Sequence, residues 1–445
     1  MSDLIRSAVA GVVWPAIPDD HAARMLTLQL QLEQSQWLPV EKLRGRQLRQ
    51  FDAAFRHAVK TVPYYRERFA ARIAGVSGWE EYRRLPVSTR RDVQDAGSAM
   101  HSEAPPPEHG AVVVTESSGS TGSPLVTRGT AWTQMLWQGF LLRDHLWHRR
   151  DLAGKLVAIR SKTSEQRLPG WGPATAPFAT GPSVVGGLSS DLDEQLQWLV
   201  AENPDYLLSL ATNLQALAER SLQLGIRLPL LKQARTYAES LRPEARAIVR
   251  QAWGVEIADS YSSEELGYLA LQCPQGEHYH VQAESVILEV LNEAGHPCAP
   301  GEIGQIVVST LHNFAMPLLR YASGDYAEVG EPCACGRGLP VLQRIIGRQR
   351  NMLLRPDGAR YWPSFASSVW RELAPVSQFQ VVQTARDVLE FRFVAPRDLS
   401  DEERGRLVGA LHEALGFTYR TTLLRMPEIP RARGGKYEDF ICAVD

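Results

Sequence analysis

The feature that most constrains the fold is an alternation of short apolar runs with amphipathic segments in the middle of the chain. The runs Leu156-Val157-Ala158-Ile159 and Tyr206-Leu207-Leu208-Ser209 are strand-like, and residues 192–203 and 213–224 have helical periodicity. Strands that alternate with helices are typical of α/β proteins with a largely parallel sheet. We therefore predict an α/β fold for the central part of the chain.

The sequence pattern changes after residue 281, which predicts a β-subdomain and a second domain in the later part of the 445 residues. The runs Val286–Leu291 and Gln305–Thr310 alternate between turns rich in Gly and Pro, which indicates an antiparallel β-subdomain. A boundary is expected after Gly347-Arg348, because the residues beyond it contain strands and a helix of their own. We expect a large N-terminal α/β domain with this β-subdomain over residues 1–349, and a small, mobile α+β domain over residues 350–445.

Charge and hydropathy exclude several classes of partner. The net charge is −2 and 44% of the residues are hydrophobic, which does not favour wholesale binding to nucleic acid or to a membrane surface. No apolar run approaches the roughly 18 residues of a spanning helix. Residues 7–14 are mildly apolar but end at Pro15 without a small-residue cleavage pattern, so we expect a docked segment rather than a secretion signal. The expected location is the cytoplasm.

A loop rich in hydroxyl groups follows Ala111–Val114, a run that predicts a buried strand. Glycine lets backbone N–H groups turn toward one point, and hydroxyls add rotatable donors, so such a loop can hold phosphate oxygens. It is not a Walker A loop, because no Gly-Lys-Ser/Thr closes it. The alternative is a flexible Ser/Gly turn. The candidate phosphate-binding residues are Thr115, Ser117, Ser118, Gly119, Ser120, Thr121 and Gly122.

Four further segments complete a pattern with this loop. They are Asp259-Ser260-Tyr261-Ser262-Ser263-Glu264-Glu265, Arg320-Tyr321-Ala322-Ser323-Gly324-Asp325, Arg344-Ile345-Ile346-Gly347-Arg348 and Pro430-Arg431-Ala432-Arg433-Gly434-Gly435-Lys436. Together they resemble the adenylate-forming superfamily of acyl-CoA synthetases, peptide-synthetase adenylation domains and luciferases. The chain looks most like the phenylacetate-CoA ligase branch, whose N-terminal signature is similar to Val62-Pro63-Tyr64-Tyr65-Arg66 and to Leu85-Pro86-Val87-Ser88-Thr89-Arg90. Within the second of these, Ser88 is expected to cap a helix that starts near Arg90.

The resemblance implies an ATP- and Mg²⁺-dependent acid–CoA ligase. Such an enzyme converts a carboxylate into an acyl-adenylate, releases pyrophosphate and then transfers the acyl group to the CoA thiol. An aromatic or similarly compact acid is the implied substrate. Two alternatives stay open: an adenylating enzyme that passes the acyl group to a carrier-protein thiol or an amine, and a non-catalytic nucleotide-binding homologue.

The resemblance also implies roles for single residues. Lys436 would neutralise charge on the α-phosphate, although an exposed tail lysine is the ordinary alternative. Glu265 would bind Mg²⁺, because a hard cation prefers carboxylate oxygen, and Glu264 takes that role if the motif is shifted by one residue. Asp325 would accept the ribose hydroxyls, and Arg350 would lie at a hinge for rotation of the small domain. The other implied nucleotide-site residues are Ala238, Glu239, Ser240, Asp259, Tyr261, Ser262 and Arg344.

Cysteine and histidine form a second constellation. Cys273 and the pair His278 and His280 lie about sixty residues before Cys333 and Cys335, across the β-subdomain. Three thiols and one imidazole make a closed tetrahedral zinc site of the structural kind. The predicted ligands are Cys273, His280, Cys333 and Cys335, with His278 as the rival imidazole. The alternative is a set of reduced cysteines beside a surface histidine pair.

Overall fold

The chain forms two compact units, Met1–Ile345 and Ile346–Asp445. The computed structural model describes residues 5–69, 75–116, 125–160, 163–188, 191–348, 352–358, 360–361, 363, 367–430 and 437–444. None of the helices in these ranges is long and apolar enough to cross a membrane.

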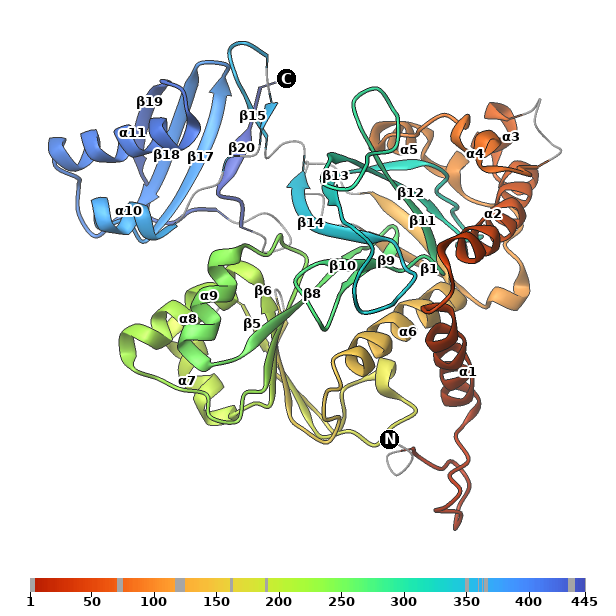
Figure 1. Cartoon of the computed structure of the whole chain (residues 1–445). Helices are drawn as coiled ribbons and strands as arrows, with labels where there is room; N and C mark the ends of the chain where they lie inside the picture. The colour runs from red at the N-terminus through yellow and green to blue at the C-terminus, as the bar shows by residue number, and fades with distance from the viewer. Residues whose placement is uncertain are drawn as a thin grey trace. The chain divides into compact units, whose positions relative to one another are not determined.

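A twelve-stranded sheet is the framework of the first unit (Figure 1). Its strand order is β11-β12-β13-β14-β10-β9-β8-β7-β6-β3-β5-β4. The parallel part comprises β3 (Leu156–Arg160), β5 (Ser183–Gly187), β6 (Tyr206–Leu210) and β7 (Gln233–Tyr237), with β4 (Gln166–Leu168) antiparallel at its edge. The antiparallel part comprises β9 (Gly267–Gln272), β10 (Tyr279–Val281), β11 (Val286–Leu291), β12 (Ile303–Thr310), β13 (Tyr321–Val329) and β14 (Val341–Arg348).

Strand β8 (Glu256–Ser263) joins the two parts into one sheet. Residues Glu256 to Asp259 pair in parallel with β7, and Ser260 to Ser263 pair antiparallel with β9. The α/β fold class is confirmed. The predicted β-subdomain, however, continues the parallel sheet. This is possible because the first half of β8 pairs with β7 and the second half pairs with β9.

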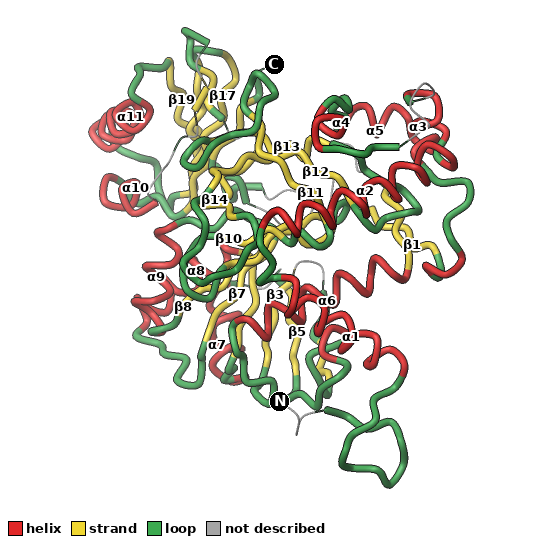
Figure 2. Tube along the Cα trace, turned by 45° about the vertical axis from the view of Figure 1, so that its right-hand side comes forward, coloured by secondary structure: helices red, strands yellow, loops and turns green. Residues whose placement is uncertain are grey.

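Helices cover both faces of the parallel part, as the alternation of side chains requires. Val157 and Leu207 face a core shared with α7 (Leu192–Glu202), α8 (Ala211–Leu224) and α9 (Pro243–Trp253). The neighbouring residues Leu156 and Tyr206 face a second core with α1 (Asp20–Ser35) and α6 (Ala131–Trp147). In Figure 2 the strands lie between these two sets of helices.

The N-terminal helices cover the antiparallel part. They are α2 (Val40–Thr61), α3 (Pro63–Arg68), α4 (Trp79–Arg83) and α5 (Arg90–Ala96), followed by the 3₁₀ turns Gly97–Met100 and Pro107–His109. Their apolar side chains share one core with β9 to β14. The cap of α5 differs from the prediction: Thr89, not Ser88, accepts from the Asp92 N–H in a capping box. Ser88 instead exchanges main-chain hydrogen bonds with β13, which removes it from the helix.

The strand before the hydroxyl loop is exposed, contrary to the prediction that it is buried. It is β1 (Val112–Glu116), which forms a two-stranded hairpin with β2 (Val126–Thr130). Val112 and Val114 are 43% and 59% exposed, because the hairpin lies outside the large sheet. The apolar run was therefore a correct signal for a strand and a wrong signal for burial.

The second unit has its own core. A four-stranded sheet has the order β19-β18-β17-β20 and comprises β17 (Gln378–Ala385), β18 (Val388–Val394), β19 (Arg420–Arg425) and β20 (Phe440–Cys442). Helices α10 (Ser367–Leu373) and α11 (Asp401–Leu415) accompany it, together with the short pair β15 (Leu353–Leu354) and β16 (Arg360–Tyr361). Phe391 and Leu407 are fully buried in the core between this sheet and α11.

A buried group of charges ties α6 to the parallel strands. Asp144 accepts from Arg150 and Arg235 at 2.7 and 2.6 Å. Burial alone would raise the pKa of Asp144, but the two guanidinium groups outweigh it and hold the pKa well below the usual range. Burial lowers the pKa of the neighbouring His145, and it lowers the pKa of His148 to about 4. Both imidazoles are therefore neutral in the folded protein at pH 7.

This group predicts a loss of stability in mild acid. A histidine whose pKa falls on folding stabilises the protein above its unfolded pKa of about 6.5, and this contribution is lost as the pH drops toward the folded pKa. For His148 the loss is about 3 kcal/mol in the free energy of unfolding between pH 7.5 and 4. Urea unfolding at several pH values should show a shallower fall for His148→Gln than for the wild type. His296→Gln, at an exposed position, should keep the wild-type slope; the same slope in both variants would contradict the assignment.

Candidate active site and metal centre

The first predicted nucleotide-binding turn lies at the carboxyl end of β7. Parallel sheets bind ligands at this edge of their strands. Ala238 has a φ of +65°, a left-handed conformation that glycine adopts without strain. The Glu239 carboxylate accepts from the N–H and the hydroxyl of Thr212 at 2.9 and 2.8 Å. It thereby caps the first turn of α8 and holds the turn in place, while Ser240 is exposed.

Tyr261 and Asp325 are brought into direct contact although 64 residues separate them. The Tyr261 hydroxyl donates to Asp325 Oδ2 at 2.7 Å. Asp325 lies in a bulge of β13, where residues 323–325 oppose Ile306 alone and Gly324 has a φ of +81°. A bulge redirects a side chain out of the regular alternation of a strand. The Ser323 hydroxyl accepts from the Asp325 N–H at 3.1 Å and stabilises this bulge.

Asp259 is buried rather than open to a ligand. Its two carboxylate oxygens accept from the Thr236 and Tyr279 hydroxyls, each at 2.6 Å. Burial raises its pKa. Asp259 therefore orders the end of β8 near Tyr261, and its carboxylate is already occupied by internal donors.

Glu264 and Glu265 lie in the turn after β8 in different surroundings. The side chain of Glu265 is 9% exposed, and its Oε1 lies 3.8 Å from Arg90 Nη1 at the start of α5. Glu264 is exposed. The ion pair restrains the Glu265 side chain more than that of the exposed Glu264. The motif that contains Arg90 did not predict this ion pair, because Arg90 and Glu265 lie far apart in the sequence.

A cavity of about 360 Å³ adjoins this turn. Threonines of the β1–β2 hairpin line it on one side, Trp137 and Phe140 of α6 on another, and both glutamates lie at its wall. The ring centroids of Tyr268 and Trp137 lie 4.8 Å apart. The cavity thus combines hydroxyl groups, two carboxylates and an aromatic wall. The part of α6 that lines this cavity is the first half of the helix.

Several predicted residues do not enter this description. Ser117, Ser118, Gly119, Ser120, Thr121, Gly122, Arg350 and Lys436 lie outside the described residues. Thr115 belongs to β1 and lines the cavity. Ser262 is half-buried on β8, and the exposed Arg344 on β14 pairs with Glu328 at 2.5 Å.

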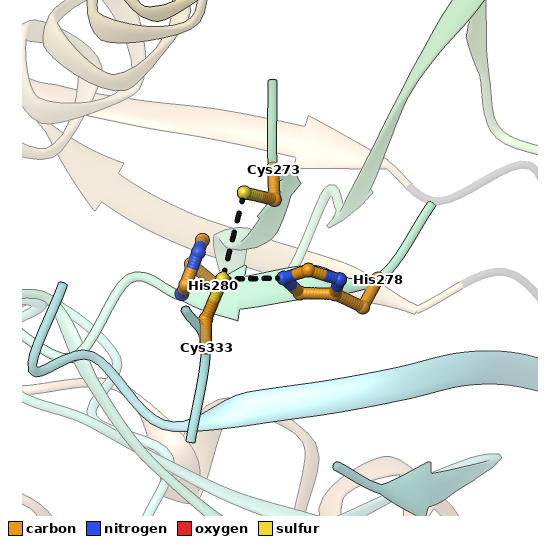
Figure 3. Close-up of side chains that lie close together, drawn as sticks. All are labelled: Cys273, His278, His280 and Cys333. Carbon is orange, nitrogen blue, oxygen red and sulfur yellow. Dashed lines mark hydrogen bonds between the residues drawn. The ribbon is translucent and has the colours of Figure 1, made fainter. Parts of the chain in front are cut away.

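The cysteine and histidine residues gather at a second place in the same unit (Figure 3). Cys273 follows β9, His280 lies on β10, and Cys333 lies in the loop before β14. Ligand atoms of Cys273, His278, His280 and Cys333 all lie within 4.8 Å of one another. Cys333 Sγ is 2.9 Å from His278 Nε2 and 3.8 Å from Cys273 Sγ. This spacing suits a tetrahedral ion bound by sulfur and imidazole.

Cys335 adds a fifth donor to this group. Its Sγ lies 3.4 Å from His280 Nε2. The backbone N–H groups of Gln275 and Cys335 donate to the sulfurs of Cys273 and Cys333 at 3.4 and 3.3 Å, as in loops that hold thiolates. The chemistry of the five donors therefore fits Zn²⁺. Because a tetrahedral site takes four ligands, either His278 or Cys335 would not bind the ion.

The loop that carries Cys333 and Cys335 also packs against the end of α1. Arg337 Nε donates to Gln36 Oε1 at 2.7 Å, and its guanidinium lies over the rings of Trp147 and Trp37. The Gly338 N–H donates to the Gln36 carbonyl at 2.8 Å. The centre thus lies among packed structural elements, which is the setting of a structural rather than a catalytic metal.

Comparison with known proteins identifies the fold and its relatives. The chain is 26% identical to a phenylacetate-coenzyme A ligase of Thermus thermophilus over 443 residues, covering 90% of this chain and 96% of the relative. It is 26% identical to the phenylacetate-coenzyme A ligase of Escherichia coli over 344 residues, covering 73% and 75%. A crystal structure of 2-hydroxyisobutyryl-CoA ligase in the postadenylation state matches 92% of this chain and 91% of that chain with a TM-score of 0.72 at 16% identity. The chain is therefore similar to phenylacetate-coenzyme A ligases over most of its length, and it shares the fold of 2-hydroxyisobutyryl-CoA ligase. No protein-family model matches the chain.

The first residue of the turn Ala238-Glu239-Ser240 has a strained backbone. The φ of Ala238 is +65°, in the left-handed region that favours glycine. An L-residue other than glycine costs roughly 1–2 kcal/mol in this conformation.

Proposed function

We propose that this protein is an ATP-dependent acid–CoA ligase that forms an acyl-adenylate and then a thioester. A carboxylate is a poor electrophile, because its leaving group would be oxide. Attack of the carboxylate oxygen on the α-phosphorus of ATP breaks the bond to the bridging oxygen and releases pyrophosphate. The CoA thiol then attacks the acyl carbon and displaces AMP, and the thiol proton passes to solvent.

The observation that carries this proposal is the hydrogen bond between Tyr261 of β8 and Asp325 of β13. It joins two motifs that the resemblance assigns to the nucleoside. A carboxylate can accept from the ribose hydroxyls, and a tyrosine ring offers adenine a flat surface. Ala238, Glu239 and Ser240, at the end of the neighbouring strand β7, would border the same nucleoside.

We assign the cavity beside Glu265 to the diphosphate end of ATP with its Mg²⁺. This assignment is supported by the threonine hydroxyls at the base of the hydroxyl loop and by the two carboxylates in the cavity wall. Mg²⁺ prefers one or two carboxylates together with phosphate oxygens. The loop Ser117 to Gly122 and Arg344 complete the proposed set, and Asp259 acts in it through the order it imposes on β8.

The substrate is proposed to be an aromatic or compact organic acid. Relatives named as phenylacetate-coenzyme A ligases support the aromatic choice. Acid-dependent exchange of pyrophosphate into ATP, measured with a panel of such acids, tests the adenylation step. AMP release on addition of CoA then tests thioester formation, and we place both steps in the cytoplasm, where the five free cysteines stay reduced.

We further propose that the cysteine–histidine centre holds a structural Zn²⁺. Cys273, His280 and Cys333 supply three ligands, and the distances above support either Cys335 or His278 as the fourth. The ion would lock β9, β10 and the loop before β14 together and so stabilise the docking of α1.

Removal of this metal should lower stability before it affects chemistry. The purified protein should contain one zinc per chain, and a chelator should lower the melting temperature while the folded fraction keeps its rate. Cys273→Ser should lose the metal, whereas Cys298→Ser, at a cysteine outside the group, should retain it. Metal content after Cys335→Ser and after His278→Ala identifies the fourth ligand. Protein purified without chelators that contains no stoichiometric zinc would overturn the proposal.

A further inference from the structure

Arg320 makes a dense set of interactions at the start of β13, five residues before the proposed ribose ligand. Its side chain is 6% exposed, and Nε lies 2.9 Å from Glu289 Oε2 on β11. Nη1 donates to the carbonyl oxygens of Arg83 and Leu85 at 2.5 and 2.6 Å. The guanidinium therefore bridges the antiparallel sheet and the segment between α4 and α5.

The surrounding groups are themselves satisfied and leave little freedom. The Tyr82 hydroxyl, fully buried, lies 3.2 Å from Glu289 Oε2 and 3.0 Å from Ser309 Oγ. Ser309 Oγ in turn accepts from the Arg320 N–H at 2.8 Å. Buried charged networks of this kind are costly to break, because each partner is left without its counterpart.

The backbone of Arg320 is held in an unusual conformation. Its φ is +45°, in the left-handed region that residues with a Cβ rarely adopt. The Ser88 N–H donates to the Arg320 carbonyl at 2.9 Å, and the Ala322 N–H donates to the Ser88 carbonyl at 2.8 Å. Such a conformation persists only where the surrounding contacts enforce it.

We infer that Arg320 is a positioning residue that sets the register of β13 and thereby the place of Asp325. The bulge over residues 323–325 begins directly after the main-chain contacts of Ser88, so a change in the backbone at Arg320 moves the start of the bulge. The Asp325 carboxylate then loses its alignment with Tyr261 and with the ribose hydroxyls. The inference rests on the proposed function, because it assumes that Asp325 binds ribose.

The test compares ATP with 2′,3′-dideoxy-ATP in the acid-dependent reaction. Hydrogen bonds to a charged group favour ATP by about 10- to 100-fold in kcat/KM for the wild type. Asp325→Ala should abolish this preference. Arg320→Lys keeps the charge but cannot reach Glu289 and both carbonyls together, and it should reduce the preference at least fivefold, mainly through a higher KM for ATP.

A matched control separates positioning from general stability. Arg143 is equally buried and pairs with Glu284 at 2.8 Å, but it ties α6 to α1. Arg143→Lys should lower the melting temperature and leave the ATP preference unchanged. Should Arg320→Lys fail to fold, Tyr82→Phe removes only a hydroxyl of the same network and should lower the preference to a smaller extent.

The outcomes are distinct. A wild type that turns over but does not prefer ATP to the dideoxy analogue, or an Asp325→Ala variant that still prefers it, overturns the ribose assignment and with it this inference. If Asp325→Ala loses the preference while Arg320→Lys and Tyr82→Phe retain it, the proposed function stands and the positioning role of Arg320 is wrong.

Discussion

Replacing Lys436 with alanine should lower acid-dependent pyrophosphate exchange by about 10²- to 10³-fold and leave thiolysis of a supplied acyl-adenylate nearly unchanged. The expected loss comes from the charge that develops on the α-phosphate and the bridging oxygen as pyrophosphate leaves. Lys436 is the only lysine in residues 346–445, so no neighbouring ammonium in that stretch replaces it. Thiolysis does not build the same charge, so it should not depend on Lys436.

Two variants sharpen this prediction. Lys436→Arg keeps the charge and should recover part of the exchange rate, whereas Arg433→Ala, three residues earlier on the same segment, should remain within a few-fold of the wild type. An equal loss of exchange and thiolysis in Lys436→Ala would contradict the division of labour between two domain positions. It would instead assign the lysine to both steps or to folding.

Glu265→Gln should lower kcat/KM for MgATP by on the order of 10²-fold, with a higher Mg²⁺ concentration needed for half-maximal rate. Glutamine keeps the size and removes the charge that a hard cation needs. Glu265 is selected over Glu264 because its side chain is 9% exposed and held by Arg90 at 3.8 Å, whereas Glu264 is exposed at the tip of the turn. Such fixed orientation favours ligand binding, since less freedom is lost when the metal arrives.

The adjacent glutamate provides the matched control. Glu264→Gln alters the same turn by the same atoms and should change kcat/KM by less than about threefold, in the range of an exposed surface charge. The reverse ranking would shift the motif by one residue and assign the metal to Glu264. Loss in both variants without a change in Mg²⁺ dependence would remove the metal role from this turn.

Much of the fold could be predicted from the sequence, because the periodicity of apolar residues reflects which side chains are buried. The runs around Val157 and Leu207 predicted strands that alternate with helices, and the structure has β3 and β6 there, with α7 between them and α8 after β6. The join of the two parts of the sheet was not predictable in the same way. Strand β8 changes partner within eight residues, and its pattern contains nothing that marks the change.

Long-range contacts limited the reading of the site. Tyr261 and Asp325 were each selected from a motif, but their hydrogen bond depends on a bulge at Gly324 that pairing with β12 creates. Arg320 was recognised only as the first residue of a motif. Its hydrogen bond with Glu289, 31 residues earlier in the chain, could not be predicted from that motif. The exposure of β1 is a further example, because an apolar strand is buried only if another layer covers it.

The most direct test of the account is a single assay of the purified protein with ATP, Mg²⁺, a panel of aromatic and compact acids, and CoA. We predict that at least one acid supports pyrophosphate exchange without CoA. When CoA is added, the same acid should be converted into acyl-CoA, with one AMP released per acyl-CoA formed. Folded protein that releases no pyrophosphate with any acid, or that releases phosphate and ADP instead, would contradict the proposed adenylation.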